Sequence, residues 1–303
     1  LPLLLLLAAC TTPGERRRME QQLAELERQN CADNLMCNDS LALTLANYFD
    51  HHGTSNEQLR AYYILGRPFA DLGEAPRAID SYLDAIARAD TTAADCDFRT
   101  LGNAYSQMAD QYHRQLLLSY EVEARRKASH YAILDNQPEM AISDMKLSAG
   151  AYILLNKPDS AEMILHECIR QYQKLELEQE RLQTTTMLMH IYASQSGRQA
   201  DLKRLIDQYD RESTWFDDNH ELHSYMRLYY SYKGKYFESV HQLDSAEYYY
   251  RKLYYPGMPF VSSDPMYKGL LHVFQKRHEA DSIAKYALLY CAVNDSSIAL
   301  NDQ

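Results

Sequence analysis

The stretch Tyr63–Ala85, YILGRPFADLGEAPRAIDSYLDA, decides the fold. Within it Gly66 is followed three positions later by Phe69, and Gly73 then interrupts the apolar pattern. Glycine in a left-handed conformation is a common end for a helix, and Pro76 falls where proline is tolerated in the first turn of the next helix. The stretch therefore predicts two antiparallel helices joined by a short turn. Gly66 lets them approach, and an aromatic ring fills the gap between them.

The same order of small and aromatic residues recurs along the chain. The clearest copies carry the packing residues Gly66, Phe69, Ala78 and Tyr82, then Ala149, Tyr152 and Ala161, and then Gly234, Phe237 and Ala246. Counted from the start of the second helix, six copies fall at residues 78, 121, 161, 201, 246 and 283. This repetition predicts an all-α chain of about six helix pairs over residues 39–303.

The repeated skeleton resembles the tetratricopeptide repeat (TPR), although its steps exceed the usual period of about 34 residues. The resemblance implies a right-handed α-solenoid whose groove, lined by the first helices of the pairs, buries a peptide or helix of a partner. Residues 63–67 and 71–78 also resemble the first repeat of lipidated TPR proteins of the Bacteroidetes. An unrelated helical bundle is the alternative.

Composition excludes several classes of function. The net charge of −11 disfavours binding to nucleic acid through phosphates. No two of the ten glycines are closer than seven residues, which excludes the glycine-rich dinucleotide, phosphate-loop and nucleophile-elbow motifs. No paired carboxylates, nucleophile–base pair or metal-ligand signature stands out. We therefore expect a non-catalytic protein without a cofactor or a metal.

The chain opens with LPLLLLLAAC, an apolar run too short to span a bilayer as a helix. Residues 7–10, LAAC, resemble the lipobox of bacterial lipoproteins, which implies lipid attachment at Cys10 and a truncated signal peptide over residues 1–9. Residues 10–38 would then hold the lipidated cysteine and a charged N-terminal helix, interpreted as a stalk. Thr11–Gly14 lacks the acidic cluster associated with surface export, which slightly favours an anchor facing the periplasm over one at the cell surface.

In an exported chain the other cysteines would meet an oxidising compartment. Cys31 and Cys37 lie in a polar stretch and could close a small disulfide in an oxidising compartment. Cys168 and Cys291 lie within amphipathic helical patterns, where we expect buried thiols.

Ten tyrosines fall between residues 225 and 255. Tyrosine combines a rigid ring with a polar group, which suits a recognition surface, but it also serves as filler between helices. The candidate binding face comprises Tyr225, Tyr229, Tyr230, Tyr232 and Tyr236.

Three polar motifs have competing interpretations. Residues 217–223, DDNHELH, gather potential metal ligands but match no metal signature, and they also fit a helix start. Residues 16–18, RRR, could touch anionic lipid or form a solvated helix face. Asp-Ser and Asp-Thr triplets fit helix N-caps and resemble the O-glycosylation acceptor sites of exported Bacteroidetes proteins; the candidate hydroxyls are Ser40, Thr91, Ser160, Ser245 and Ser282.

These observations favour a TPR scaffold or adaptor, tethered by lipid in the bacterial cell envelope, that binds an envelope protein or peptide. One alternative is the sensor domain of a longer transmembrane signalling protein that continues past Gln303. Another is a glycan-binding outer-membrane lipoprotein, which the single tryptophan, Trp215, disfavours. The oligomeric state stays open.

Overall fold

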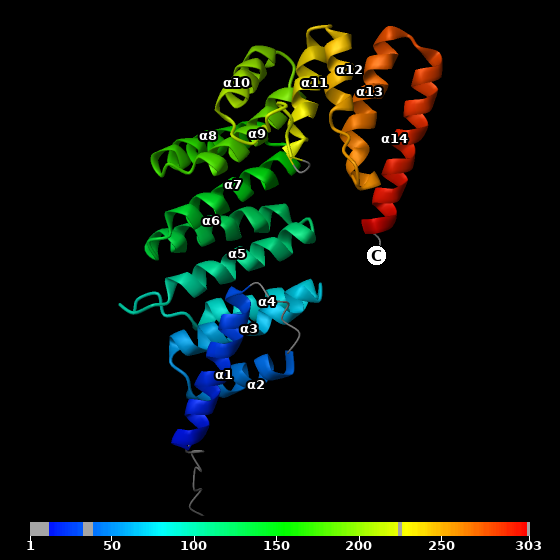
Figure 1. Cartoon of the computed structure of the whole chain (residues 1–303). Helices are drawn as coiled ribbons and strands as arrows, with labels where there is room; N and C mark the ends of the chain where they lie inside the picture. The colour runs from blue at the N-terminus through cyan, green and yellow to red at the C-terminus, as the bar shows by residue number, and fades with distance from the viewer. Residues whose placement is uncertain (1–11, 33–38, 224–225, 302–303) are drawn as a thin grey trace, which may run out of the picture. The chain divides into compact units, whose positions relative to one another are not determined.

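The computed structural model describes residues 12–32, 39–223 and 226–301 (Figure 1). Most of these residues are helical, and their only β-type pairing is one antiparallel bridge between Phe216 and Leu222. The helices, in chain order, are α1 (Pro13–Cys31), α2 (Asp39–His52), α3 (Ser55–Asp71), α4 (Ala75–Arg88), α5 (Phe98–Arg114), α6 (Leu118–Leu134), α7 (Pro138–Leu154), α8 (Pro158–Lys174), α9 (Glu178–Ser194), α10 (Gln199–Glu212), α11 (Tyr229–Ser239), α12 (Leu243–Arg251), the short 3₁₀ helix η2 (Phe260–Ser263), α13 (Asp264–Arg277) and α14 (Ala280–Asn301).

The chain divides into two compact units, and the boundary between Ile164 and Leu165 falls inside α8. The six predicted repeat positions, 78, 121, 161, 201, 246 and 283, lie in α4, α6, α8, α10, α12 and α14. Each of these is the second helix of a pair, and the first helices are α3, α5, α7, α9, α11 and α13. The prediction of an all-α solenoid of helix pairs is confirmed.

The turn between the two helices of a pair has a recurring geometry. Gly73 adopts φ +78°, and Leu116, Asn156, His241 and His278 take the same left-handed role with φ of 55–59°. The residue that follows closes a helix-ending hydrogen bond: the Glu74 N–H donates to the Phe69 carbonyl at 2.8 Å. This 6→1 bond satisfies a carbonyl that the ending helix leaves free.

The same bond recurs at the carbonyls of Tyr112, Tyr152, Phe237 and Phe274. The aromatic residue of the repeat therefore marks the last turn of the first helix as well as filling space. Side chains other than glycine tolerate the left-handed conformation at some cost, so glycine alone does not reveal these turns in the sequence.

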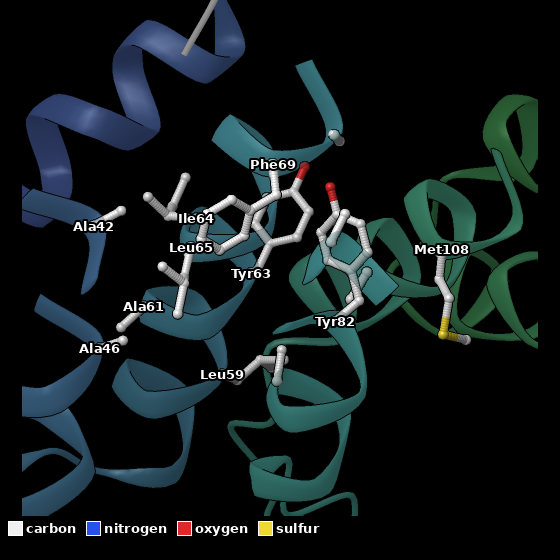
Figure 2. Packing of buried hydrophobic residues seen from close by; sticks show 14 of the residues in the cluster. Ala42, Ala46, Leu59, Ala61, Tyr63, Ile64, Leu65, Phe69, Tyr82 and Met108 are labelled. Atoms are coloured by element: carbon white, nitrogen blue, oxygen red, sulfur yellow. The ribbon is translucent and has the colours of Figure 1, made fainter. Parts of the chain in front are cut away.

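Close packing at the α3/α4 crossing follows from Gly66. A methyl group added there would collide with ring carbons of Tyr82, which is fully buried on α4. Figure 2 shows Tyr82 beside Tyr63, with 6.1 Å between the ring centroids. The glycine thus supplies the space that the tyrosine ring occupies.

Helix α1 belongs to the core of the first unit, so the interpretation of this segment as a stalk is wrong. Met19, Leu23 and Leu26 are buried in the same cluster as α2 and α3 side chains. An ion pair between Arg16 and Glu57, with 2.5 Å between Nη2 and Oε1, further attaches α1 to α3. Met19, Leu23 and Leu26 thus form the packing face of α1, and their burial stabilises the unit because it removes apolar surface from water.

Arg125 of α6 lies in a buried polar cluster with side chains of α5 and α7. Its guanidinium donates to Asp144 Oδ1 at 2.8 Å and to Ser106 Oγ at 3.0 Å, and it also forms an ion pair with Asp110. Burial raises the pKa of the Asp144 carboxyl, and the charge of Arg125 opposes that rise. The first unit therefore encloses a buried cation whose partners come from the chain itself.

Among the described residues, no helix is both long and apolar enough to cross a bilayer.

Candidate functional site

A pocket of about 370 Å³ lies on the first helices of three successive pairs in the second unit. Its walls come from α9, α11 and α13, the helices that the TPR resemblance assigns to the groove. The lining residues are His190, Leu228, Ser231, Tyr232, Lys235, Glu238, Tyr250, Asp264, Pro265, Lys268, Gly269 and His272. Its size lies within the range of small-ligand sites.

The floor of the pocket is built around Tyr250 of α12. Methyl groups added at Gly234 of α11 or Gly269 of α13 would collide with the Tyr250 ring, so two first helices approach it through glycines. The Tyr250 hydroxyl donates to Glu238 Oε2 at 2.8 Å. Burial, and then the negative charge of Glu238, raises the pKa of Tyr250. The tyrosine is thereby fixed as a neutral hydrogen-bond donor.

Glu238 already has partners inside the protein. Besides Tyr250, Lys276 Nζ lies 3.0 Å from Glu238 Oε1, and His272 Nδ1 lies 3.9 Å from the same oxygen. Its carboxylate is therefore shared between a hydroxyl and a lysine on α13. It also lies on the same helix as Lys235 but forms no ion pair with it within 4.0 Å.

Lys235 and Lys268 contribute two positive charges to the pocket wall. Partial burial lowers the pKa of Lys235, and the charge of Lys268 lowers it further. Lys268, on α13, is exposed. Two ammonium groups that repel each other mark a place where an anion would be favourable.

His190 of α9 closes another part of the pocket wall. Its ring centroid lies 6.3 Å from that of Tyr232 in an edge-on arrangement. Partial burial, followed by the charge of Lys235, lowers the pKa of His190. Burial raises the pKa of Tyr232 to about 12. Both side chains therefore stay neutral near pH 7, which leaves the lysines as the cations of this wall.

The predicted tyrosine face is largely buried, so the expectation of an exposed recognition surface is wrong for three of its members. Tyr229, Tyr230 and Tyr232 are 2%, 2% and 6% exposed. Tyr236 is half-buried, and Tyr225 lies outside the described residues. Of this set only Tyr232 lines the pocket.

The tyrosines are buried because they stack on other rings and bond to neighbouring groups. The ring centroids of Tyr229 and Tyr209 lie 4.3 Å apart in a stacked arrangement. The Tyr229 hydroxyl donates to Asp210 Oδ1 at 2.7 Å, and Lys233 Nζ lies 2.7 Å from the other oxygen of that carboxylate. These tyrosines thus serve the alternative role, as filler between helices.

The predicted packing residues occupy two kinds of environment. Tyr152 and Phe237 are half-buried. The others are buried: Gly66, Phe69, Ala78, Tyr82, Ala149, Ala161, Gly234 and Ala246. Lys235 and Lys268 had no comparable signal in the sequence, because what distinguishes them among the described residues is the lack of a carboxylate within ion-pair distance, although Glu238 and Asp264 line the same pocket.

One of the two predictions of a buried cysteine is confirmed and the other is wrong. Cys168 is buried as expected, whereas Cys291 is exposed on α14, so the prediction of a buried thiol there is wrong. Cys31 is exposed at the end of α1. Cys37 and the lipidation residue Cys10 lie outside the described residues, so both the disulfide and the anchor stay predictions.

The segment 217–223 forms a tight turn rather than a helix start. Asp217 Oδ1 accepts from the N–H groups of Asn219 and Glu221 at 2.9 and 2.8 Å. Within residues 12–32, 39–223 and 226–301, no group of three or more His, Cys, Asp or Glu side chains is placed to hold a metal ion.

The candidate glycosylation hydroxyls differ in exposure. Ser40 and Thr91 are exposed, whereas Ser160, Ser245 and Ser282 are half-buried. Their modification stays a prediction.

The fold is that of TPR-like helical repeat proteins. Aspartyl phosphate phosphatase F from Bacillus subtilis is similar with a TM-score of 0.59 and 12% identity over 91% of this chain and 68% of that chain. The nearly identical TPR-like repeats of a Podosopora anserina protein described as a kinesin light chain are similar with a TM-score of 0.50 and 16% identity, over 63% of this chain and 92% of that chain. At these identities the likeness shows the fold alone. No family model and no curated protein sequence matches this chain.

Proposed function

We propose that this protein is a non-catalytic interaction scaffold that binds a protein or peptide partner on the first helices of its repeats. The observation that carries the proposal is the pocket on α9, α11 and α13. These are first helices of their pairs, and the resemblance to TPR proteins implies that first helices line the groove that binds a partner. A concave pocket that combines apolar contact area with polar and charged side chains suits an inserted segment of a partner.

We propose further that lipid on Cys10 tethers the protein in the bacterial cell envelope, facing the periplasm. The support is the sequence 7–10, LAAC, directly after an apolar run. Lipid chains would hold the protein at a membrane surface without a spanning segment.

Site-specific photo-crosslinking tests the interaction. A benzophenone amino acid at Leu228, which is exposed at the pocket, is compared with the same group at Leu72, exposed at the end of α3. We expect discrete crosslinked partners from the Leu228 position in intact cells and none in common with Leu72. Equal and diffuse crosslinking from both positions would contradict a partner site at this pocket.

Metabolic labelling with an alkyne fatty acid tests the tether. The wild-type chain should incorporate the label and fractionate with membranes, and Cys10→Ala should lose both properties. Label that persists in Cys10→Ala would show that the anchor is elsewhere.

A further inference from the structure

We infer that a second pocket of this protein binds a small aromatic carboxylate, an acid of one or two rings. This pocket, called here the α12–α14 pocket, has a volume of about 420 Å³ and is lined by residues of α12, α13 and α14 and by Tyr254 just beyond α12. It shares no residue with the pocket on α9, α11 and α13, and binding there does not require the peptide-binding function proposed above.

The buried part of the lining is apolar and aromatic. Tyr286 of α14 is 6% exposed, and its ring is stacked on Phe274 of α13 with 5.2 Å between the ring centroids. Met266 and Leu270, one turn apart on α13, are the other buried members of the lining. Because these side chains belong to the core of the second unit, a ligand would meet a preformed apolar surface.

Two further tyrosine rings line the more open part of the pocket. Tyr254 is 59% exposed. Tyr267 of α13 is half-buried, and its ring centroid lies 6.4 Å from that of Tyr286 in a tilted arrangement. Aromatic rings pair favourably in offset or edge-on arrangements at about this separation, so the three tyrosines favour a ligand with a flat aromatic body.

The charged residues of the α12–α14 pocket are both cations. Arg251 and Lys285 line it, and no carboxylate does among the described residues, although the net charge of the whole chain is −11. For Lys285 the described part of the chain provides neither a hydrogen-bond nor an ion-pair partner, and its Nζ lies 5.4 Å from the centroid of the Tyr286 ring. An anionic group beside that ring would be attracted by the lysine without meeting a like charge in the wall.

Arg251 keeps hydrogen-bond donors for a ligand. Its Nε donates to Glu247 Oε1 at 2.8 Å, Nη2 lies 2.7 Å from the same oxygen, and Nη1 donates to the Tyr286 hydroxyl at 3.2 Å. A guanidinium carries five N–H donors, so these contacts leave two of them. Glu247 is also shared with Arg277, whose Nη1 lies 2.5 Å from the other carboxylate oxygen. A carboxylate from a ligand would therefore add a charge-assisted hydrogen bond at Arg251.

The lining disfavours other acids of similar size. The hydroxyl groups of a sugar acid would need hydrogen-bond partners, and Met266, Leu270 and Leu289 offer none. Burying a hydroxyl without a partner is costly. An aliphatic acid has several rotatable bonds that binding would order, which lowers its affinity. An aromatic acid has neither cost, and a pocket of this volume admits one or two rings.

Isothermal titration calorimetry of the full chain with four defined probes tests the inference. The ligand probe is cinnamate, and cinnamamide is its neutral counterpart. Octanoate represents an aliphatic acid and glucuronate a sugar acid. We expect saturable binding of cinnamate and at least about fivefold weaker binding of the other three, since each lacks either the charge or the ring.

The variant protein is Lys285→Glu, and the matched control is Lys268→Glu. Both lysines are exposed and both substitutions change the net charge equally, but Lys268 does not line the α12–α14 pocket. The affinity for cinnamate should fall at least about fivefold in Lys285→Glu and stay within about twofold in the control. Tyr254→Ala, which removes an exposed ring, should also weaken binding. Circular dichroism should be unchanged in all three variants.

Each contrary outcome overturns one part of the assignment. An absence of saturable cinnamate binding would overturn the site, and equal affinity for cinnamamide would overturn the need for an anion. Stronger binding of octanoate or glucuronate would overturn the aromatic body. Unchanged affinity in Lys285→Glu, or equal losses in Lys285→Glu and Lys268→Glu, would overturn the assignment to this pocket. Leu228 does not line the α12–α14 pocket, so crosslinking from Leu228 still tests the partner site separately.

Discussion

Arg125 in the first unit and Lys235 in the second are both cations removed from full solvent, but their surroundings differ. Arg125 is 3% exposed and is held by Asp144, Asp110 and Ser106. Lys235 is half-buried, lines the same pocket as Lys268 and has no ion-pair partner among the described residues. Arg125 therefore has its carboxylate partners within the chain, whereas Lys235 has none within ion-pair distance among the described residues.

This difference distinguishes a cation that stabilises the fold from a cation that the fold only tolerates. Removing a cation that satisfies buried carboxylates leaves those carboxylates uncompensated. Removing a cation that is repelled by a neighbouring cation removes that repulsion from the folded state. Substitution of Arg125 should therefore lower the free energy of unfolding, whereas substitution of Lys235 should raise it.

The largest effect is expected for Arg125→Met. Asp144 would lose its partner while still buried, so we expect a loss of about 3–5 kcal/mol in the free energy of unfolding at pH 7, measured by urea denaturation. The matched control is Arg126→Met, whose solvent-exposed pair with Glu123 should contribute far less to the free energy of unfolding. Equal losses in the two variants would contradict the structural role of the buried cluster.

Packing at the helix crossings allows the next test. Gly66→Leu should destabilise the first unit by about 1–3 kcal/mol, or more, because the side chain would overlap the Tyr82 ring. At Gly102 of α5 the nearest atom to an added methyl group would be Tyr131 Cβ at 3.5 Å. Gly102→Ala should therefore be neutral or stabilising by up to about 1 kcal/mol. A Gly66→Leu melting curve that matches the wild type would show that the crossing is looser than described.

The sequence was sufficient for the helix pairs because small and aromatic residues recur where helices cross. Residue 78 and its five counterparts all fall in second helices. The capping box of Thr54 and Glu57 is a local feature of the same kind, since both of its hydrogen bonds join residues three positions apart.

The pocket was not readable from the sequence. Tyrosine clusters predict either a surface or a core, and only the stacking of Tyr229 on Tyr209 decides between them. Lys235 and Lys233 lie two residues apart on α11, yet Lys233 pairs with Asp210, whereas Lys235 has no ion-pair partner in the part of the chain that the structure describes. The distinction depends on carboxylates from other helices, which no local pattern contains.

Tyr250→Phe probes the floor of the pocket and should have an intermediate effect. It removes the 2.8 Å hydrogen bond to Glu238, so we expect a loss of about 1.5 kcal/mol in the free energy of unfolding. The ring that fills the space at Gly234 and Gly269 is kept, and α-helical circular dichroism should be unchanged. An unaltered melting temperature would indicate that the hydrogen bond between Tyr250 and Glu238 contributes nothing to the free energy of unfolding.

The smallest effect on stability is expected for Lys235→Met, and its sign distinguishes the two cations. Since burial lowers the pKa of Lys235 in the folded state, the unfolded chain binds more protons between that pKa and the ordinary lysine value of about 10.4. Wild-type stability should thus rise with pH across this window relative to the variant. At pH 7 the variant should be more stable by less than about 1 kcal/mol, and the gain should fade above pH 10. Urea denaturation of both proteins at matched pH values measures this difference. The titration of tyrosines near pH 10 affects both proteins equally and therefore cancels in the comparison. A variant less stable than the wild type at pH 7 would mean that the fold itself compensates the charge of Lys235, as it does for Arg125.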